Sequence, residues 1–120
     1  MTRRAVVLFG HGSRDPLWRL PIEAVAARAQ ALAPEVAVAC AYLELTEPDL
    51  PSVTTALVDG GATDIRVVPM FLGVGRHARE DLPALVEALR QQYPGVQFEL
   101  QAAIGEHPQL LELMAAIAVG

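Results

Sequence analysis

A histidine held between two glycines at the end of an apolar run limits the possible folds of this chain more than any other stretch. Residues 6–9, Val-Val-Leu-Phe, lead directly into Gly10, His11 and Gly12. A short and unbroken apolar run of this kind is typical of a strand that is buried on both faces. The glycines allow a sharp turn and leave the imidazole accessible. We therefore expect His11 at the carboxyl end of the first strand, the edge at which open parallel sheets bind ligands.

Apolar periodicity and turn signals predict strands that alternate with helices along the whole chain. The strands are expected at residues 4–9, 36–43, 65–71 and 96–102. The helices are expected at residues 17–32, from about Leu50 to Gly60, from Glu80 onward and around Leu110 to Ile117. Such alternation predicts an α/β fold of the flavodoxin-like type, a three-layer structure with a four-stranded parallel sheet, helices on both faces and strand order 2-1-3-4. Pro69 lacks a ladder donor, so we expect a bulge or the strand end near it.

Length and composition exclude several classes of protein. With 120 residues, 52% of them hydrophobic, the chain is expected to form a single domain over residues 1–120. A net charge of −5 argues against binding to nucleic acid or to an anionic membrane surface. Cys40 is the only cysteine, which excludes an internal disulfide and a thiolate metal cluster. The apolar stretch near the start is too short for a signal peptide or a membrane span, so we expect a cytoplasmic protein.

The expected strand order brings three candidate metal ligands to one crevice. His11 leaves the first strand and His77 follows the third, which is its neighbour in the sheet. Glu44 leaves the second strand at the same edge. Two imidazoles and a carboxylate suit a borderline divalent metal such as Co²⁺, Ni²⁺ or Fe²⁺. Since three ligands leave a coordination position open, such a metal would be handled transiently and not stored.

Three arginines in the same loops indicate the chemistry of a partner molecule. Arg14 follows the first strand, and Arg76 and Arg79 flank His77. Guanidinium groups bind carboxylates through paired hydrogen bonds, so these residues favour a polycarboxylate ligand.

Each candidate residue also has a structural interpretation. The segment Gly-His-Gly-Ser at residues 10–13 suits an anion-binding turn at a helix start, and Glu44 suits a helix cap. Ser13 beside His11 suggests a nucleophile, but the strained turn that usually presents a nucleophilic serine is lacking. Two other functions therefore stay open: a phosphate- or nucleotide-binding flavodoxin-like module, and a metal chaperone without catalytic activity.

Four segments of the chain resemble, in order and spacing, those of the class II chelatases. They are residues 7–16 (VLFGHGSRDP), 41–44 (AYLE), 67–72 (VVPMFL) and 75–83 (GRHAREDLP). The likeness is greatest to the short-form, CbiX-type sirohydrochlorin cobaltochelatases, and it covers nearly the whole chain. Pro69 fits this resemblance as a strand-end proline.

The resemblance implies insertion of a divalent metal into sirohydrochlorin, a polycarboxylate tetrapyrrole. Co²⁺ for cobalamin biosynthesis is the first expectation, and a siroheme ferrochelatase using Fe²⁺ or a nickel chelatase acting on the same substrate are the alternatives. No permanently bound cofactor is implied. Longer members of the family carry two such units in one chain, so a homodimer is implied here. By position, the resemblance implies that His11, His77 and Glu44 are catalytic and bind the metal, and that Arg14, Ser13, Arg76 and Arg79 hold substrate carboxylates.

Overall fold

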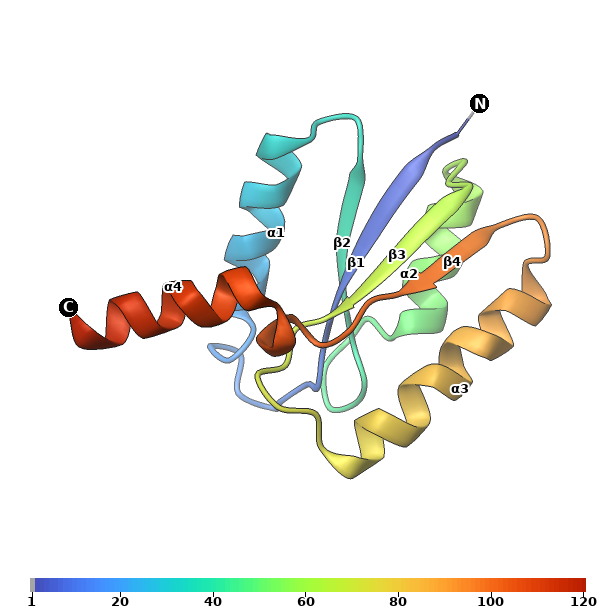
Figure 1. The fold of residues 1–120 in the computed structure, drawn as a ribbon. Coiled ribbons are helices and arrows are strands. Elements are labelled where there is room, and N and C mark those ends of the chain that lie inside the picture. Colours follow the sequence, from blue (N-terminus) through green and yellow to red (C-terminus); the bar gives the residue numbers. More distant parts are fainter. Residues whose placement is uncertain (1) are drawn as a thin grey trace.

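A four-stranded parallel sheet organises the computed structural model, which describes residues 2–120 (Figure 1). The strands are β1 (Arg4–Gly10), β2 (Ala37–Tyr42), β3 (Asp64–Pro69) and β4 (Gln97–Leu100). The helices are α1 (Leu20–Leu32), α2 (Leu50–Asp59), α3 (Arg76–Gln92), the short 3-10 turn η1 (Ile104–Glu106) and α4 (Pro108–Val119). The strand order β2-β1-β3-β4 confirms the predicted topology. The end of β3 at Pro69 confirms the expected break there.

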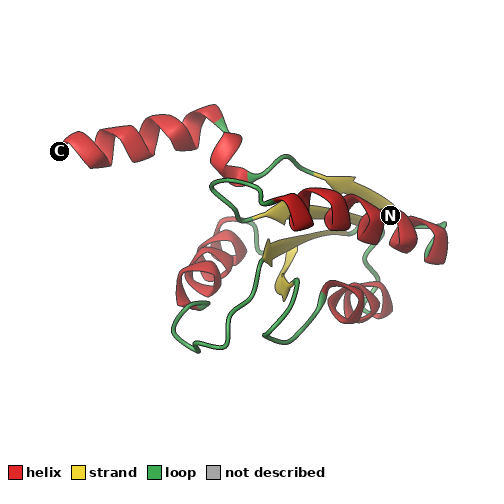
Figure 2. Ribbon diagram, turned by 90° about the horizontal axis from the view of Figure 1, so that it is seen from below, coloured by secondary structure: helices red, strands yellow, loops and turns green. Residues whose placement is uncertain are grey.

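Helices cover the two faces of the sheet unequally. Side chains alternate between the faces of a strand, so odd-numbered residues of β1 and β3 face one way and even-numbered residues face the other. α2 and α3 pack on the first face, where Leu50 and Val86 are buried against Phe9 and Val67. On the second face α1 packs with Ile22 buried near Leu8, and Ile104 of η1 packs against the same cluster. α4 covers neither face and extends away from the sheet (Figures 1 and 2).

Two helices begin at residues other than those expected from the sequence. α3 starts at Arg76, four residues before Glu80, with Gly75 in extended conformation as its N-cap. The acidic pair at residues 80–81 suggested the helix start, but Glu80 pairs with Arg76 at 3.2 Å across one helical turn. His77 therefore lies in the first turn of α3 and not in a loop. α1 starts at Leu20 and not at residue 17, with Pro21 in its first turn.

None of the helices within residues 2–120 combines the length and the apolar character needed to cross a membrane.

The start of α2 is fixed by a side-chain cap. Asp49 has an extended backbone, and its Oδ1 accepts a hydrogen bond of 2.9 Å from the backbone N–H of Ser52. This bond satisfies one of the amide groups that have no partner inside the helix. Hydrogen bonding from Ser52 lowers the pKa of the Asp49 carboxyl below its ordinary value.

We expect Asp49→Ala to lower the free energy of unfolding by about 1 kcal/mol at neutral pH, because it removes the cap. Asp49→Asn keeps an acceptor oxygen and should cost less. The folded-state pKa of Asp49 is lowered, so its charge adds stability above the unfolded pKa, and this contribution is lost as the pH falls through the folded pKa. Urea unfolding at neutral and acidic pH measures both effects. The assignment would be contradicted if the difference in unfolding free energy between the wild type and Asp49→Ala grew as the pH fell.

Candidate functional site

His11 and Glu44 lie side by side at the carboxyl edge of the sheet. His11 directly follows β1, and Glu44 comes two residues after β2. The imidazole Nε2 lies 2.9 Å from the carboxylate Oε1. The His11 side chain is 49% exposed and the Glu44 side chain 54%, so both stay open to a ligand. A carboxylate at this distance fixes the orientation of the imidazole.

Backbone pairing beyond the strands brings these two side chains together. The N–H of Leu43 donates to the carbonyl oxygen of Gly10 at 2.9 Å. The N–H of Glu44 donates to the carbonyl oxygen of His11 at 3.1 Å. The β1–β2 pairing therefore continues into the loops, and the position of Glu44 follows from the register of the sheet.

Gly12 is required by the close approach of the two loops. Its φ is +105°, in the region that favours glycine. A Cβ atom at this position would lie 1.7 Å from the carbonyl oxygen of Glu44. Any other residue would therefore force apart the loops that carry His11 and Glu44.

Thr46 joins the same two loops through its hydroxyl group. Its Oγ1 accepts a hydrogen bond of 3.3 Å from the backbone N–H of Ser13 and donates to the carbonyl oxygen of Ser13. Sequence reasoning missed this residue, because no pattern in the sequence marks a contact between these two loops. The Ser13 hydroxyl itself accepts from the N–H of Asp15 at 3.1 Å, so it takes part in the turn of its own loop.

The two candidate histidines share one hollow. It has a volume of about 260 Å³ and is lined by His11, Phe71, Gly73, Gly75, Arg76, His77 and Ala78. His77 is exposed in the first turn of α3, where the partial positive charge of the helix N-terminus attracts anions. In residues 2–120 no three His, Cys, Asp or Glu side chains are close enough to hold a metal ion jointly. The structure thus pairs His11 with Glu44 and places His77 on the same hollow as His11.

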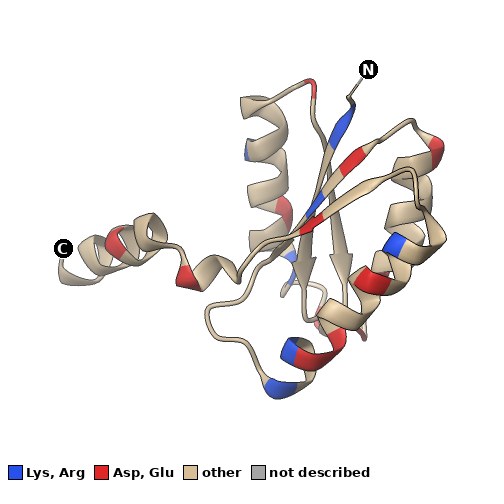
Figure 3. Ribbon diagram, turned by 45° about the vertical axis from the view of Figure 1, so that its right-hand side comes forward, with Lys and Arg blue, Asp and Glu red and all other residues tan. Residues whose placement is uncertain are grey.

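The three candidate arginines are spread around this edge. Arg76 lines the hollow of the histidines, and its guanidinium pairs with the carboxylate of Glu80. Figure 3 shows this mixture of basic and acidic residues at the start of α3. Arg79 lines a separate hollow of about 130 Å³ between the start of α3 and the ends of β3 and β4. Arg14 is exposed in the loop that follows His11.

A larger hollow lies beside Glu44. It has a volume of about 560 Å³ and is lined by residues 42–49 together with Ser52. Three carboxylates, those of Glu44, Glu47 and Asp49, are among the lining groups. Clustered carboxylates give this side of the edge a negative potential, which attracts cations and repels a polycarboxylate. A polycarboxylate ligand is therefore expected on the side of His77.

Two polar side chains of β2 near the site, the buried Tyr42 and the half-buried Cys40, take a structural part. Burial raises the pKa of Tyr42 to about 12, so its phenol stays neutral. The Tyr42 ring packs edge-on against Trp18, with 5.9 Å between the ring centres. Burial also raises the pKa of the Cys40 thiol, which makes a thiolate ligand unfavourable here.

The chain is similar over most of its length to a family of known proteins. A family model described as CbiX matches residues 5–118. A sirohydrochlorin cobaltochelatase of Priestia megaterium is 29% identical over 92% of this chain and 36% of its own length. A chloroplastic sirohydrochlorin ferrochelatase of Arabidopsis thaliana is 28% identical over 91% of this chain and 48% of its own. The chain thus spans half or less of the length of these two relatives.

Solved structures with the same fold include both short and long chains. A CbiX protein from Marinobacter aquaeolei VT8 is 33% identical, with a TM-score of 0.83 over 96% of this chain and 93% of its own. The sirohydrochlorin chelatase SirB from Bacillus subtilis subspecies spizizenii, in complex with cobalt, is 28% identical, with a TM-score of 0.81. The SirB match covers 97% of this chain and 49% of its own.

We expect Gly12→Ala to lower the free energy of unfolding by about 2–4 kcal/mol, because the new Cβ meets the Glu44 carbonyl oxygen at a positive φ. Gly73→Ala is the matched control. Nothing lies within 4 Å of a Cβ at Gly73, so its effect should stay within about 0.5 kcal/mol. Chemical denaturation of the two variants measures the difference. Equal stabilities would show that the loops are not held as closely as described.

Proposed function

The chain belongs to the CbiX family. On that premise we propose that it inserts a divalent metal ion into sirohydrochlorin, with Co²⁺ as the first choice of metal. The observation that carries the proposal is the hollow shared by His11 and His77, with Glu44 held against His11. Relatives are named both as cobaltochelatases and as ferrochelatases, so Fe²⁺ is the alternative metal. Ni²⁺ suits the same imidazole and carboxylate ligands.

The two histidines supply what the proton balance of metal insertion requires. A divalent metal that enters a tetrapyrrole replaces two N–H protons, so two proton acceptors are needed. A neutral imidazole accepts a proton near physiological pH. We assign one proton to His11, whose ring is oriented by the Glu44 carboxylate 2.9 Å away. We assign the other proton to His77, on the same hollow.

The same side chains deliver the metal, which is a substrate here. His11, His77 and Glu44 are all exposed, so the metal can approach from solvent. Because these three side chains are not close enough to hold the ion jointly, at most two of them contact it at a time, which leaves coordination positions free for the tetrapyrrole nitrogens. The Nε2–H of His11 donates to the Glu44 carboxylate, which leaves Nδ1 as the ring nitrogen that binds the metal and then takes a pyrrole proton.

Arginines and the start of α3 supply the binding of substrate carboxylates. Arg76 lines the hollow of the histidines, and Arg14 is exposed in the loop after His11. The first backbone N–H groups of α3 have no partner inside the helix, and its dipole favours negative charge. We therefore assign substrate binding to Arg14 and Arg76. Arg79 and Ser13 stay predictions, since Arg79 lines a neighbouring hollow and the Ser13 hydroxyl takes part in its own turn.

We further propose that two copies assemble into a homodimer. The cobalt complex of SirB aligns over 97% of this chain but only 49% of its own, so it is about twice as long as the matched unit. Two copies of this chain would reach the same size. We also propose a cytoplasmic location, which the single cysteine fits.

We expect the purified protein to accelerate metal insertion into sirohydrochlorin, followed by anaerobic absorbance with Co²⁺, Fe²⁺ or Ni²⁺. His11→Ala and His77→Ala should each lower the rate by about 10²–10⁴-fold, since each removes a proton acceptor. His107→Asn is the matched control. His107 only caps α4, with its Nδ1 accepting from Gln109 N–H at 3.2 Å, and asparagine also caps helices.

Rates equal to the protein-free reaction with all three metals would overturn the proposed activity. Binding of a nucleotide or phosphoester would then support the flavodoxin-like alternative. Tight metal binding without effect on the tetrapyrrole would support a metal chaperone. Unchanged rates in both histidine variants would overturn the assignment of these residues.

We expect Arg14→Ala to raise KM for sirohydrochlorin about tenfold or more while kcat changes little, because one charge-assisted hydrogen bond to the substrate is lost. Arg28→Ala in α1 is the matched control, since its guanidinium donates to the Ala24 carbonyl of its own helix at 3.2 Å. Steady-state kinetics with saturating metal separates the two constants. A fall in kcat at constant KM would assign Arg14 to the chemical step and contradict its binding role.

A further inference from the structure

The loop after β2 makes a strained turn directly behind Glu44. Leu45 has a φ of +65°, and the backbone N–H of Thr46 donates to the carbonyl oxygen of Glu44 at 2.8 Å. A hydrogen bond that spans three residues around a positive φ makes a strained γ-turn, which is rare for a residue with a Cβ atom. The Leu45 side chain is 52% exposed, so its own packing does little to offset the strain. The turn therefore depends on contacts made by its neighbours.

Thr46 makes these contacts through a single hydroxyl group. Its Oγ1 accepts a hydrogen bond of 3.3 Å from the N–H of Ser13 and donates to the carbonyl oxygen of the same residue. Within residues 2–120, these are the only side-chain hydrogen bonds between segments 11–15 and 43–48 besides the contact of His11 with Glu44. Loss of the hydroxyl would leave two backbone groups of the half-buried Ser13 without this partner, which costs free energy.

The base of the same loop is closed independently of Thr46. The Tyr42 N–H donates to the Pro48 carbonyl oxygen at 2.9 Å, and Tyr42 forms an isolated parallel bridge with Asp49. The two ends of segment 43–48 are therefore fixed against each other. Removal of the Thr46 hydroxyl would release the middle of the segment, which contains the strained turn, and leave its ends in place.

The turn also sets the direction of the Glu44 side chain. The bond from the Glu44 N–H to the His11 carbonyl oxygen fixes the backbone on the amino side of Glu44. The direction and rotamer of a side chain depend on both dihedral angles at its Cα atom, and the carboxyl side of Glu44 leads into the turn. The Glu44 side chain is 54% exposed and flexible, so it has many other rotamers once the backbone moves. The contact of 2.9 Å with His11 therefore depends on the turn keeping its strained form.

We propose that Thr46 is a positioning residue for metal insertion. Its hydroxyl holds the strained turn at Leu45 closed, and the turn keeps the Glu44 carboxylate on the His11 ring. The inference rests on the function proposed above, in which His11 binds the metal and takes a pyrrole proton. Groups that orient a metal-binding histidine commonly contribute about 10–100-fold to metal affinity or activity.

Steady-state kinetics of two Thr46 variants tests the role of the hydroxyl, with Co²⁺ varied at saturating sirohydrochlorin. Thr46→Val removes the hydroxyl and keeps a similar shape, so kcat/KM for Co²⁺ should fall by about 10–100-fold. KM for sirohydrochlorin should change less than about twofold, because the substrate-binding arginines are untouched. Thr46→Ser keeps the hydroxyl and should recover most of the rate. A wild-type rate in Thr46→Val, or an equal loss in Thr46→Ser, would overturn the proposal.

Thr55→Val is the matched control for the loss of a threonine hydroxyl. The Thr55 hydroxyl lies in α2, where it donates to the Pro51 carbonyl oxygen at 3.1 Å. This variant should lose some stability in urea unfolding and keep the wild-type rate. An equal loss of rate in Thr55→Val would mean that the assay reports stability and would overturn the role of Thr46.

A double-mutant cycle tests whether Thr46 acts through Glu44. Glu44→Ala should lower the rate by itself. Adding Thr46→Val should then change the rate by less than about twofold, since the carboxylate to be positioned is gone. Two residues that act independently would give losses that multiply, and that result would overturn the proposal.

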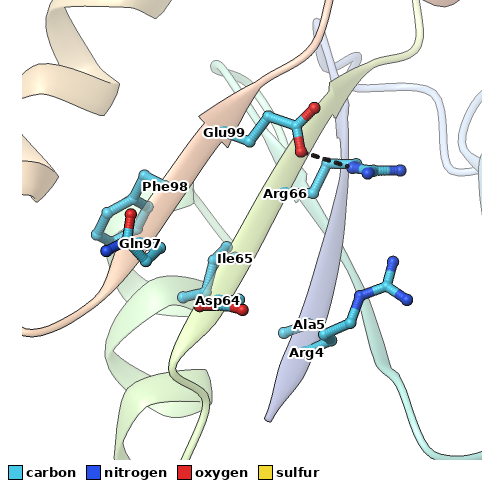
Figure 4. Close-up of a pocket in the computed structure, with 8 residues that line it drawn as sticks. All are labelled: Arg4, Ala5, Asp64, Ile65, Arg66, Gln97, Phe98 and Glu99. Atoms are coloured by element: carbon cyan, nitrogen blue, oxygen red, sulfur yellow. Dashed lines mark hydrogen bonds and ion pairs between the residues drawn. The ribbon is translucent and has the colours of Figure 1, made fainter. Parts of the chain in front are cut away.

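Glu99→Ala is the matched control for the loss of an exposed carboxylate. Glu99 pairs with Arg66 at 3.0 Å in a hollow of about 450 Å³ (Figure 4). The first residues of β1, β3 and β4 line this hollow, so it lies at the amino ends of the strands and away from His11. In the Glu99→Ala background, Thr46→Val should keep its full effect on the rate. A diminished effect there would contradict the link between Thr46 and Glu44.

Nitrogen NMR of His11 tests the positioning without an assay of activity. The signals of the two ring nitrogens report which of them carries the proton in a neutral imidazole. The wild type should show the Nε2–H form held by Glu44, and Thr46→Val should shift both signals toward those of Glu44→Ala. Thr46→Ser should resemble the wild type. Signals in Thr46→Val that stay at the wild-type positions would overturn the proposal.

The NMR result separates the failure of this inference from the failure of the proposed function. An active wild type whose His11 signals do not respond to Thr46→Val would reject the positioning role alone. A wild type that does not insert metal but shows the expected shifts would reject only the proposed activity.

Discussion

The pairing of β1 with β2 sets the arrangement of His11 and Glu44 in the candidate site. Two backbone hydrogen bonds extend this pairing past the strand ends, from Leu43 to Gly10 and from Glu44 to His11. They place the carboxylate of Glu44 against the His11 ring and bring the loops so close that only glycine fits at position 12. The chemistry at the edge is thus a consequence of sheet register. A one-residue slip would turn every side chain of β2 to the opposite face and separate the pair.

Most of the fold could be predicted because each strand is followed by a helix, and that alternation leaves few topologies besides a parallel sheet with the confirmed order. The start of α3 was misplaced because acidic residues usually mark the first turn of a helix. Here Glu80 instead pairs with Arg76 one turn earlier, and Gly75 begins the helix without a side-chain cap. The place of α4 could not be predicted. An apolar stripe indicates that a helix packs, but not on which surface.

The site was predictable to the extent that it depends on strand ends. Neighbouring strands deliver their exit loops to one edge, which is why His11, Glu44 and His77 could be grouped from the sequence alone. Contacts between loops were beyond such reasoning. The Thr46 hydroxyl forms hydrogen bonds with the Ser13 backbone only because the two loops lie in contact, and no pattern in the sequence indicates that contact. Likewise, the arginines share a stretch of sequence, but Arg76 and Arg79 line different hollows.

The size of the site connects the proposed activity to the proposed assembly. Pockets that enclose drug-sized ligands usually measure about 300–1,000 Å³. The hollow shared by His11 and His77 measures about 260 Å³, and a tetrapyrrole with its carboxylates is larger than a typical drug. One copy therefore offers one wall of a binding site. The second copy of the proposed homodimer would supply the other boundary that a large, flat substrate needs.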